Sequence, residues 1–347
     1  NFIGEDSLAA RLHADRFAMC MPRIRFDEDL INEAITGIQE AFKNSSFHMH
    51  IFVGVYDIHD VEERVSIMCD KANLASETIK NEYKSSVAYY TEHLLEKSIE
   101  ERKIIGEFDR ALDNEEFVMF LQPQVDVSGK PFGSEALVRW QHPDKGLLAP
   151  GVFIDVLEKT GFVYRLDRYM WDKAVKQLAE WKKRGINDYH ISTKDFYLID
   201  VYETFVGLVE KYDIDPKLLK LEITETALMS DFNKNMVIIK RLQKYGFDIE
   251  IDDFGSGYSS LNMLKDISAD VLDMGFLRAS ENEVKGQDIL ESIIGLANKL
   301  GMRVITEGVE KKTQVDMLYD MGCKMFQGYY FSKPIPVDEF EKKYNIG

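Results

Sequence analysis

Residues 247–255 read FDIEIDDFG, an alternating apolar run that ends in two adjacent carboxylates and a glycine. The alternation predicts a strand, and the glycine predicts a turn directly after it. Asp252 and Asp253 repel each other at the tip of this strand, so a positive group is expected beside them. A pair of divalent metal ions is one interpretation, because hard cations take carboxylate oxygens. The alternative is a helix N-cap followed by a solvated turn acid.

The same pattern of short apolar runs continues on both sides of this segment, and amphipathic helical patterns lie between most of them. We expect eight strands, at residues 117–125, 134–140, 189–192, 219–224, 247–252, 271–273, 303–306 and 325–330. Strands that alternate with helices over this length favour an α/β fold of the TIM-like (β/α)8 barrel type over an open sheet. We therefore expect three parts, a smaller α+β region at 1–86, a connecting helix at 87–104 and the barrel at 105–347.

Polar side chains recur where these strands end, which is where barrel enzymes carry their chemistry. Glu222 stands between Leu221 and Ile223, where an isolated buried carboxylate is costly and metal coordination removes the cost. The candidate site residues on the strands are Gln122, Glu135, Glu222, Asp252, Asp253, Glu307 and Gln327.

Composition excludes some functions and restricts others. The formal charge of −17 argues against a nucleic-acid polymer or an anionic membrane surface as partner, and a phosphate ligand would need a metal or an arginine. Cys20, Cys69 and Cys323 have no metal-ligand spacing, which fits reduced thiols in the cytoplasm. No apolar run reaches the roughly 20 residues of a membrane span. The chain starts at Asn1 in mid-pattern, so we expect a fragment of a longer protein, which leaves room for a sensor or a membrane anchor upstream.

Several motifs carry a resemblance to a known family. Residues 134–140 read SEALVRW, and the further matching segments are QP at 122–123, LEITE at 221–225, DDFGSGYSSL at 252–261, EGVE at 307–310 and QGY at 327–329. Together they resemble EAL domains, the bacterial barrel phosphodiesterases that hydrolyse the second messenger cyclic di-GMP. The resemblance covers roughly residues 105–347.

The resemblance implies a reaction and a set of roles. The expected reaction is hydrolysis of cyclic di-GMP to the linear dinucleotide pGpG with Mg²⁺ or Mn²⁺ in a two-metal site, because divalent ions neutralise a phosphodiester and activate water. The implied metal ligands are Glu135, Glu222, Asp252 and Asp253, and the implied catalytic residues are Glu307, Asp253 and Glu135. The residues implied to contact the substrate or order the site are Gln122, Arg139, Gln327 and Asp273, and those implied to hold loops are Glu225 and Glu310. The family also suggests a homodimer through the barrel domain.

Two strands depart from the family pattern. The third strand of the family carries a Val-Asn-x-Ser element with a metal-binding asparagine, whereas residues 189–196 read YHISTKDF, so this position falls on His190 or is deleted. The sixth strand of the family reads Lys-Ile-Asp, whereas residues 270–274 read DVLDM. Either the barrel binds cyclic di-GMP without cleaving it efficiently, or residues are missing near Ser192–Thr193 and Leu272–Asp273.

The first region resembles a partial, degenerate GGDEF domain. Residues 8–17 read LAARLHADRF, similar to the strand-turn-strand of that domain, with His13 and Ala14 where its signature has glycines and Arg16 where it has an acid. Cyclase activity is therefore not expected, and the region is interpreted as a regulatory lobe or a packing partner.

Three functions stay open from the sequence. They are a metal-dependent phosphodiesterase, a catalytically silent cyclic di-GMP receptor that signals through the connecting helix, and a scaffold that uses neither metal nor nucleotide. The intact set of acids argues against the scaffold.

Overall fold

The computed structural model consists of two compact units, Asn1–Gly106 and Glu107–Gly347, each described by itself below. The residues that the structure describes are 6–42, 50–80, 86–195, 201–252, 254, 269–274 and 284–346. Asp253, one of the predicted metal ligands, lies outside these residues, as does most of the loop that follows it.

The first unit contains two small sheets and helices. The predicted hairpin is confirmed, because β1 (Leu8–His13) pairs antiparallel with β2 (Arg16–Cys20). The parallel strands β3 (Phe52–Val55) and β4 (Ser86–Tyr89) form the other sheet. Its helices are η1 (Arg23–Arg25), α1 (Glu28–Ala41), α2 (Val65–Glu77) and the first part of α3 (Glu92–Asp113). Helix α2 packs on β3 so closely that a Cβ at Gly54 would lie 1.7 Å from the carbonyl oxygen of Ala72.

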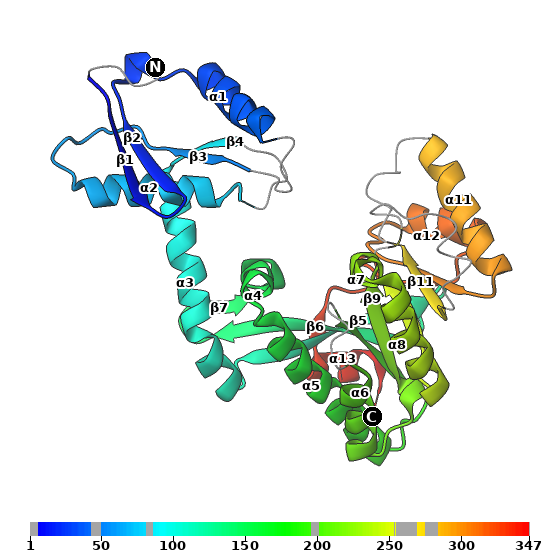
Figure 1. Ribbon diagram of the computed structural model, residues 1–347. Coiled ribbons are helices and arrows are strands. Elements are labelled where there is room, and N and C mark those ends of the chain that lie inside the picture. Colours follow the sequence, from blue (N-terminus) through cyan, green and yellow to red (C-terminus); the bar gives the residue numbers. More distant parts are fainter. Residues whose placement is uncertain are drawn as a thin grey trace. The chain divides into compact units, whose positions relative to one another are not determined.

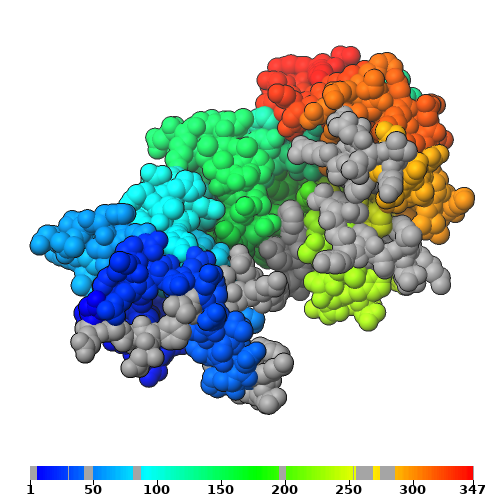
Figure 2. Space-filling model, turned by 90° about the horizontal axis from the view of Figure 1, so that it is seen from above, coloured from blue at the N-terminus to red at the C-terminus, as the bar shows by residue number. Residues whose placement is uncertain are grey.

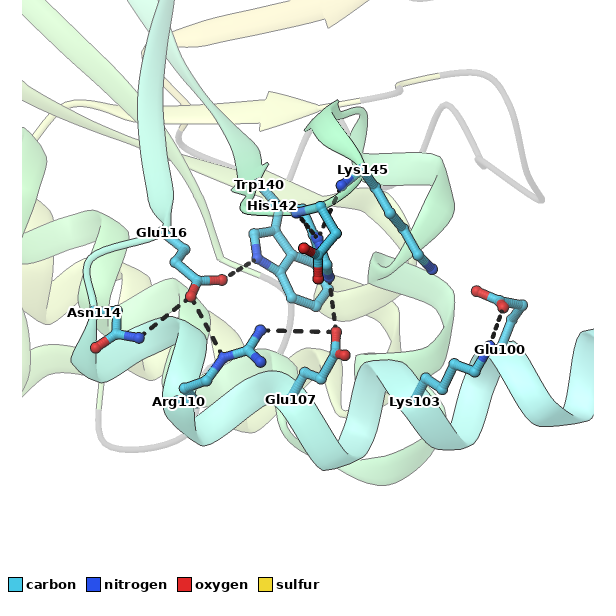
Figure 3. Close-up of polar contacts among 10 residues, drawn as sticks. Glu100, Lys103, Glu107, Arg110, Asn114, Glu116, Trp140, His142 and Lys145 are labelled. Atoms are coloured by element: carbon cyan, nitrogen blue, oxygen red, sulfur yellow. Dashed lines mark hydrogen bonds and ion pairs between the residues drawn. The ribbon is translucent and has the colours of Figure 1, made fainter.

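The last turns of α3 belong to the second unit and are fixed to β6 by polar contacts (Figure 3). Nε2 of His142 lies 2.8 Å from a carboxylate oxygen of Glu107. The indole nitrogen of Trp140 donates to Glu116 at 3.0 Å, and Arg110 lies 3.5 Å from the same carboxylate. The chain therefore enters the second unit inside a continuous helix.

The second unit is the predicted α/β barrel. Its strands are β5 (Phe117–Asp126), β6 (Pro131–His142), β8 (His190–Asp195), β9 (Leu219–Thr224), β10 (Ile249–Asp252), β11 (Val271–Met274), β12 (Arg303–Thr306) and β13 (Met325–Phe326), and β5 pairs with both β6 and β13 to close the ring. Two short strands, β7 (Gly146–Leu148) and β14 (Ile335–Pro336), add to its edges. The eight predicted strands are confirmed, and the fold class is as expected.

One feature differs from a uniformly parallel barrel. Strand β5 is antiparallel to β6 and to β13, because residues 127–130 join β5 to β6 by a short turn instead of a helix. The barrel is therefore mixed, and Gln122 of β5 lies directly opposite Glu135 of β6.

Helices cover the outside of the strands. Helices α5, α6 and α8 lie along the outer side of the strands that precede β10 (Figure 1), and the C-terminal part of the chain, coloured orange to red, forms one continuous surface (Figure 2). The helices of this unit are η2 (Pro150–Val152), α4 (Ile154–Thr160), α5 (Val163–Lys183), α6 (Val201–Tyr212), η3 (Pro216–Leu218), α7 (Glu225–Ser230), α8 (Phe232–Tyr245), α11 (Val284–Lys299), α12 (Lys312–Asp320) and α13 (Val337–Tyr344). Among the described helices, none combines the length and apolar character that a bilayer crossing requires.

Candidate functional site

Four acids meet where the parallel strands of the barrel end. The side chain of Glu222 comes from β9, that of Asp252 from the last residue of β10, and that of Asp273 from β11, while Glu307 directly follows β12. We call these four residues the rim acids. Glu222, Asp252 and Asp273 are buried. Apolar surroundings do not stabilise an ionised carboxylate, so burial of these three groups costs free energy unless a positive charge lies beside them.

Three of the rim acids have the spacing of a metal site. Asp252, Asp273 and Glu307 each offer a carboxylate oxygen, and these oxygens all lie within 4.8 Å of one another. Buried oxygens of Glu222 and Asp273 have no hydrogen-bond partner among the described residues. Hard divalent cations such as Mg²⁺ and Mn²⁺ prefer carboxylate oxygens, so the residues present fit such an ion.

The predicted ligand set and this cluster overlap in part. Asp252 was predicted as a metal ligand and Glu307 as a catalytic residue. The structure brings them together with Asp273, which was predicted to contact the substrate or order the site. Glu135 lies close enough to Glu222 and Glu307 to raise the pKa of both carboxyl groups by charge repulsion.

Burial and mutual repulsion make three of the rim acids, Glu222, Asp273 and Glu307, hard to ionise. Burial and then Glu135 raise the pKa of Glu222 well above its usual range. Burial and then Glu307 raise the pKa of Asp273 in the same direction, and burial with Glu135 raises that of Glu307 to about 8. A cation at the rim would reverse these shifts, because it favours the ionised form.

Lys194 of β8 also lies at the rim, and the sequence analysis gave it no role. Its Nζ lies 2.7 Å from Oδ2 of Asp252, and its side chain is 33% exposed. Burial opposes its charge, but Asp252, Glu135, Glu222 and Glu307 together raise its pKa well above the usual value. Alternation along β8 could have found it, because residues 190, 192 and 194 share one face of a strand.

Glu135 is held by a chain of two glutamines. Nε2 of Gln327 donates to a carboxylate oxygen of Glu135 and lies 3.5 Å from Oε1 of Gln122. Nε2 of Gln122 donates to the Ser332 carbonyl at 3.2 Å. All three side chains are buried. Gln327 therefore contacts both Glu135 and Gln122, and this arrangement orders the site.

The loop that bears Glu307 is fixed against the loop that bears Gln327. The amide of Val309 donates to the Gln327 carbonyl at 3.1 Å. A Cβ at Gly328 would lie 2.1 Å from the Val309 carbonyl oxygen, so only glycine permits this approach.

Arg139 follows Glu135 on the same face of β6 and is partly buried. Its guanidinium donates to the carbonyl of Val138 at 2.8 Å and lies 5.5 Å from the ring centre of Phe120. Burial lowers its pKa, while Tyr329 and Glu135 oppose that shift. The remaining donors of the guanidinium fork suit a phosphate.

The two residues predicted to hold loops lie on different elements. Glu225 is buried at the start of α7, where the Thr224 hydroxyl accepts from the amide of Ala227 at 3.2 Å. Glu310 is exposed, and its amide donates to the side chain of Gln314 at 2.7 Å. The loop that Glu225 is predicted to brace lies outside the described residues.

Below the rim, three neutral side chains of the barrel contact one another. Nε2 of His190 lies 2.9 Å from Oε1 of Gln124, and Nε2 of Gln124 donates to the Ser192 hydroxyl at 3.3 Å. We call Gln124, His190 and Ser192 the floor. Burial, with Lys220 and Arg303, lowers the pKa of His190 well below its usual value. His190 therefore does not stand among the rim acids in the place of a metal-binding asparagine.

A further buried acid, Glu250, was not predicted as a site residue. It precedes Asp252 on the same face of β10, and burial raises its pKa to about 7 although Lys220 opposes the shift. Lys220 is itself buried, and burial lowers its pKa. The charge of each residue therefore offsets part of the free-energy cost of burying the other.

Comparison with known proteins agrees with this geometry. The family model described as "EAL domain" matches residues 105–334, which is more than half of the chain. This chain belongs to the EAL domain family.

Individual relatives extend the comparison. The cyclic di-GMP phosphodiesterase PA2567 of Pseudomonas aeruginosa is 35% identical over 245 residues, which are 69% of this chain and 42% of that protein. An uncharacterised protein, sll1895 of Synechocystis, is 28% identical over 342 residues, which are 95% of this chain and 49% of that protein. The chain thus spans about half or less of the length of these relatives.

A solved structure is similar to the barrel. The structure titled "PaMucR Phosphodiesterase, c-di-GMP complex" matches with a TM-score of 0.66 and 31% identity, and the match covers 69% of this chain and 99% of that one.

Proposed function

We propose that this chain is a divalent-metal-dependent phosphodiesterase that hydrolyses cyclic di-GMP to pGpG. The observation that carries the proposal is the cluster of Asp252, Asp273 and Glu307 at the ends of the barrel strands. The relatives PA2567 and PaMucR, both named as phosphodiesterases, support the same substrate.

The rim supplies what a phosphodiester needs. We assign Glu135, Glu222, Asp252, Asp253 and Asp273 to hold one or two Mg²⁺ or Mn²⁺ ions. When bound, these ions would neutralise the phosphate and lower the pKa of a water molecule. Glu307 would orient that water and accept its proton, because its carboxylate lies beside those of Asp252 and Asp273.

Other side chains would bind and orient the substrate. Arg139 would donate its planar fork to one phosphate, an interaction that lysine cannot replace. Gln122 and Gln327 would hold Glu135 in place through the contacts that they already make.

A second function, binding without cleavage, is favoured by one observation. Lys194 forms an ion pair with Asp252 in the middle of the carboxylates, where a metal would be held. In that case the chain would be a cyclic di-GMP receptor whose rim is neutralised by its own lysine.

The N-terminal unit would be a regulatory lobe related to a GGDEF domain. We propose domains at 1–86 and 105–347 with a connector at 87–104, a cytoplasmic location, and a homodimer through the barrel. The strand hairpin β1–β2 and the continuous helix α3 support a lobe that transmits a signal along one helix.

One assay separates the two functions. The protein is incubated with cyclic di-GMP and Mg²⁺, and the linear dinucleotide is sought by chromatography. Product that disappears in Glu135→Ala, while that variant keeps the circular dichroism spectrum of the wild type, supports hydrolysis. Retained binding of cyclic di-GMP without any product supports the receptor, and product that survives in Glu135→Ala contradicts the assigned site.

A further inference from the structure

Lys194 is placed at the rim by the register of β8. It lies opposite Glu222 of β9, and the indole nitrogen of the fully buried Trp171 donates to its backbone carbonyl at 3.1 Å. The inward face of β8 therefore leads from His190 and Ser192 in the floor to Lys194 at the rim.

The ammonium group stands where positive charge is most needed. Its Nζ is 2.7 Å from Oδ2 of Asp252, a carboxylate that is 2% exposed, and its field extends to Glu222 and Glu307. Buried carboxylates without a cation would repel one another at high cost, because the barrel interior screens charge poorly. In the metal-free chain Lys194 thus offsets part of the charge of the rim acids.

The same position conflicts with a metal ion. Mg²⁺ binds carboxylate oxygens at about 2.0–2.1 Å, so an ion on Oδ2 of Asp252 would lie against the ammonium group and be repelled by it. The side chain of Lys194 is 33% exposed, and its four-carbon stem is flexible, so the ammonium group has a path to water.

We propose that Lys194 is an internal counter-ion that competes with divalent metal for Asp252 and must leave the rim before metal binds there. The inference rests on the proposed metal site. It adds that the chain exists in two states, a lysine-neutralised one and a metal-loaded one, with the metal concentration selecting between them.

Calorimetric titration of Mn²⁺ into the metal-free 347-residue protein, without nucleotide, tests this competition. Lys194→Met should bind Mn²⁺ about tenfold more tightly than the wild type, because the competitor is gone. Lys194→Arg should bind no more tightly than the wild type, because it keeps the charge. The matched control is Lys211→Met, which removes a lysine that is ion-paired at 2.8 Å with Asp172 outside the barrel and should leave Mn²⁺ affinity unchanged.

The outcomes decide the inference. Equal or weaker Mn²⁺ binding by Lys194→Met, or no binding by any of the proteins, overturns it. Binding by Lys194→Met alone supports it and shows that the lysine closes the site in the wild type. Hydrolysis of cyclic di-GMP, measured in the same samples, reports separately on the proposed function, so tight Mn²⁺ binding without product contradicts only the latter.

A measurement on the wild type covers the case in which Lys194→Met does not fold. Reductive methylation followed by mass spectrometry reports the exposure of each lysine as Mn²⁺ is added. The reactivity of Lys194 should rise by several-fold, while that of Lys211 stays constant. Unchanged reactivity of Lys194 at Mn²⁺ concentrations that saturate the calorimetric signal overturns the inference, as does the absence of such a signal.

Discussion

The floor and the rim of the barrel are built on the same strands and meet opposite demands. In the floor, His190, Gln124 and Ser192 are neutral and satisfy one another by hydrogen bonds. At the rim, two residues after Ser192 on β8, Lys194 faces four carboxylates. Both regions are polar and largely buried, yet only the rim has more negative charge than its own residues neutralise.

This difference indicates that the floor stabilises the fold and that the rim binds a ligand. Buried polar groups that satisfy one another stabilise and specify a core, whereas buried carboxylates with oxygens left unpartnered cost free energy that a bound cation recovers. Substitutions should therefore destabilise the floor, while the removal of charge from the rim should stabilise the metal-free protein.

The largest effect is expected at Gly133, which lies against the floor residue His190. A Cβ there would lie 2.0 Å from Nε2 of His190, so Gly133→Ala must displace the ring and its hydrogen bond. The free energy of unfolding in urea should fall by about 3 kcal/mol. Gly151→Ala is the control, because nothing lies within 4 Å of the added Cβ. Equal unfolding midpoints for the two variants would show that the floor is not tightly packed.

A smaller loss is expected for Gln124→Leu, which removes the shared partner of His190 and Ser192. The buried His190 ring nitrogen that loses this partner should lower the free energy of unfolding by about 2 kcal/mol. The Ser192 hydroxyl keeps the Ser134 carbonyl as an acceptor at 3.4 Å. Urea unfolding at neutral pH measures this change. A variant as stable as the wild type would mean that the floor does not depend on these hydrogen bonds.

The opposite sign is expected at the rim for Glu222→Gln. This carboxyl is buried beside Glu135 and Asp252, so the neutral amide should raise the free energy of unfolding in metal-free buffer by about 1 kcal/mol. The same variant should lose stabilisation by Mn²⁺. A stability loss like that of Gln124→Leu would remove the distinction between floor and rim.

The smallest effect is expected in the pH dependence of the free energy of unfolding. The folded state raises the pKa of Glu307 from 4.5 to about 8, so it binds this proton more tightly than the unfolded state does. The resulting stability is present at low pH and is lost as pH rises between about 4.5 and about 8. Urea unfolding across this range should show the decline in metal-free buffer and a smaller one for Glu307→Gln. An identical slope for the variant would contradict the assignment.

The sequence predicted the strands well because their apolar periodicity is local. It did not reveal that β5 runs antiparallel to its neighbours, although the lack of a helical pattern at residues 127–130 accounts for it. The acids at the strand ends were also predictable, since parallel strands present their carboxyl ends at one edge of a barrel. Alternation along β8 places Lys194 on the inward face of the strand, but its ion pair with Asp252 was not predictable. Asp252 lies two strands away, and the meeting of the two side chains depends on register.

Thermodynamic linkage at Asp252 tests the central claim that the rim is a divalent-metal site. The free energy of unfolding is measured for the wild type and for Asp252→Asn, with and without Mn²⁺. At a Mn²⁺ concentration of about 100 times Kd, the wild type should gain about 2.7 kcal/mol, and Asp252→Asn should gain almost nothing. Equal gains in the two proteins, or none in the wild type at any Mn²⁺ concentration, would contradict the account.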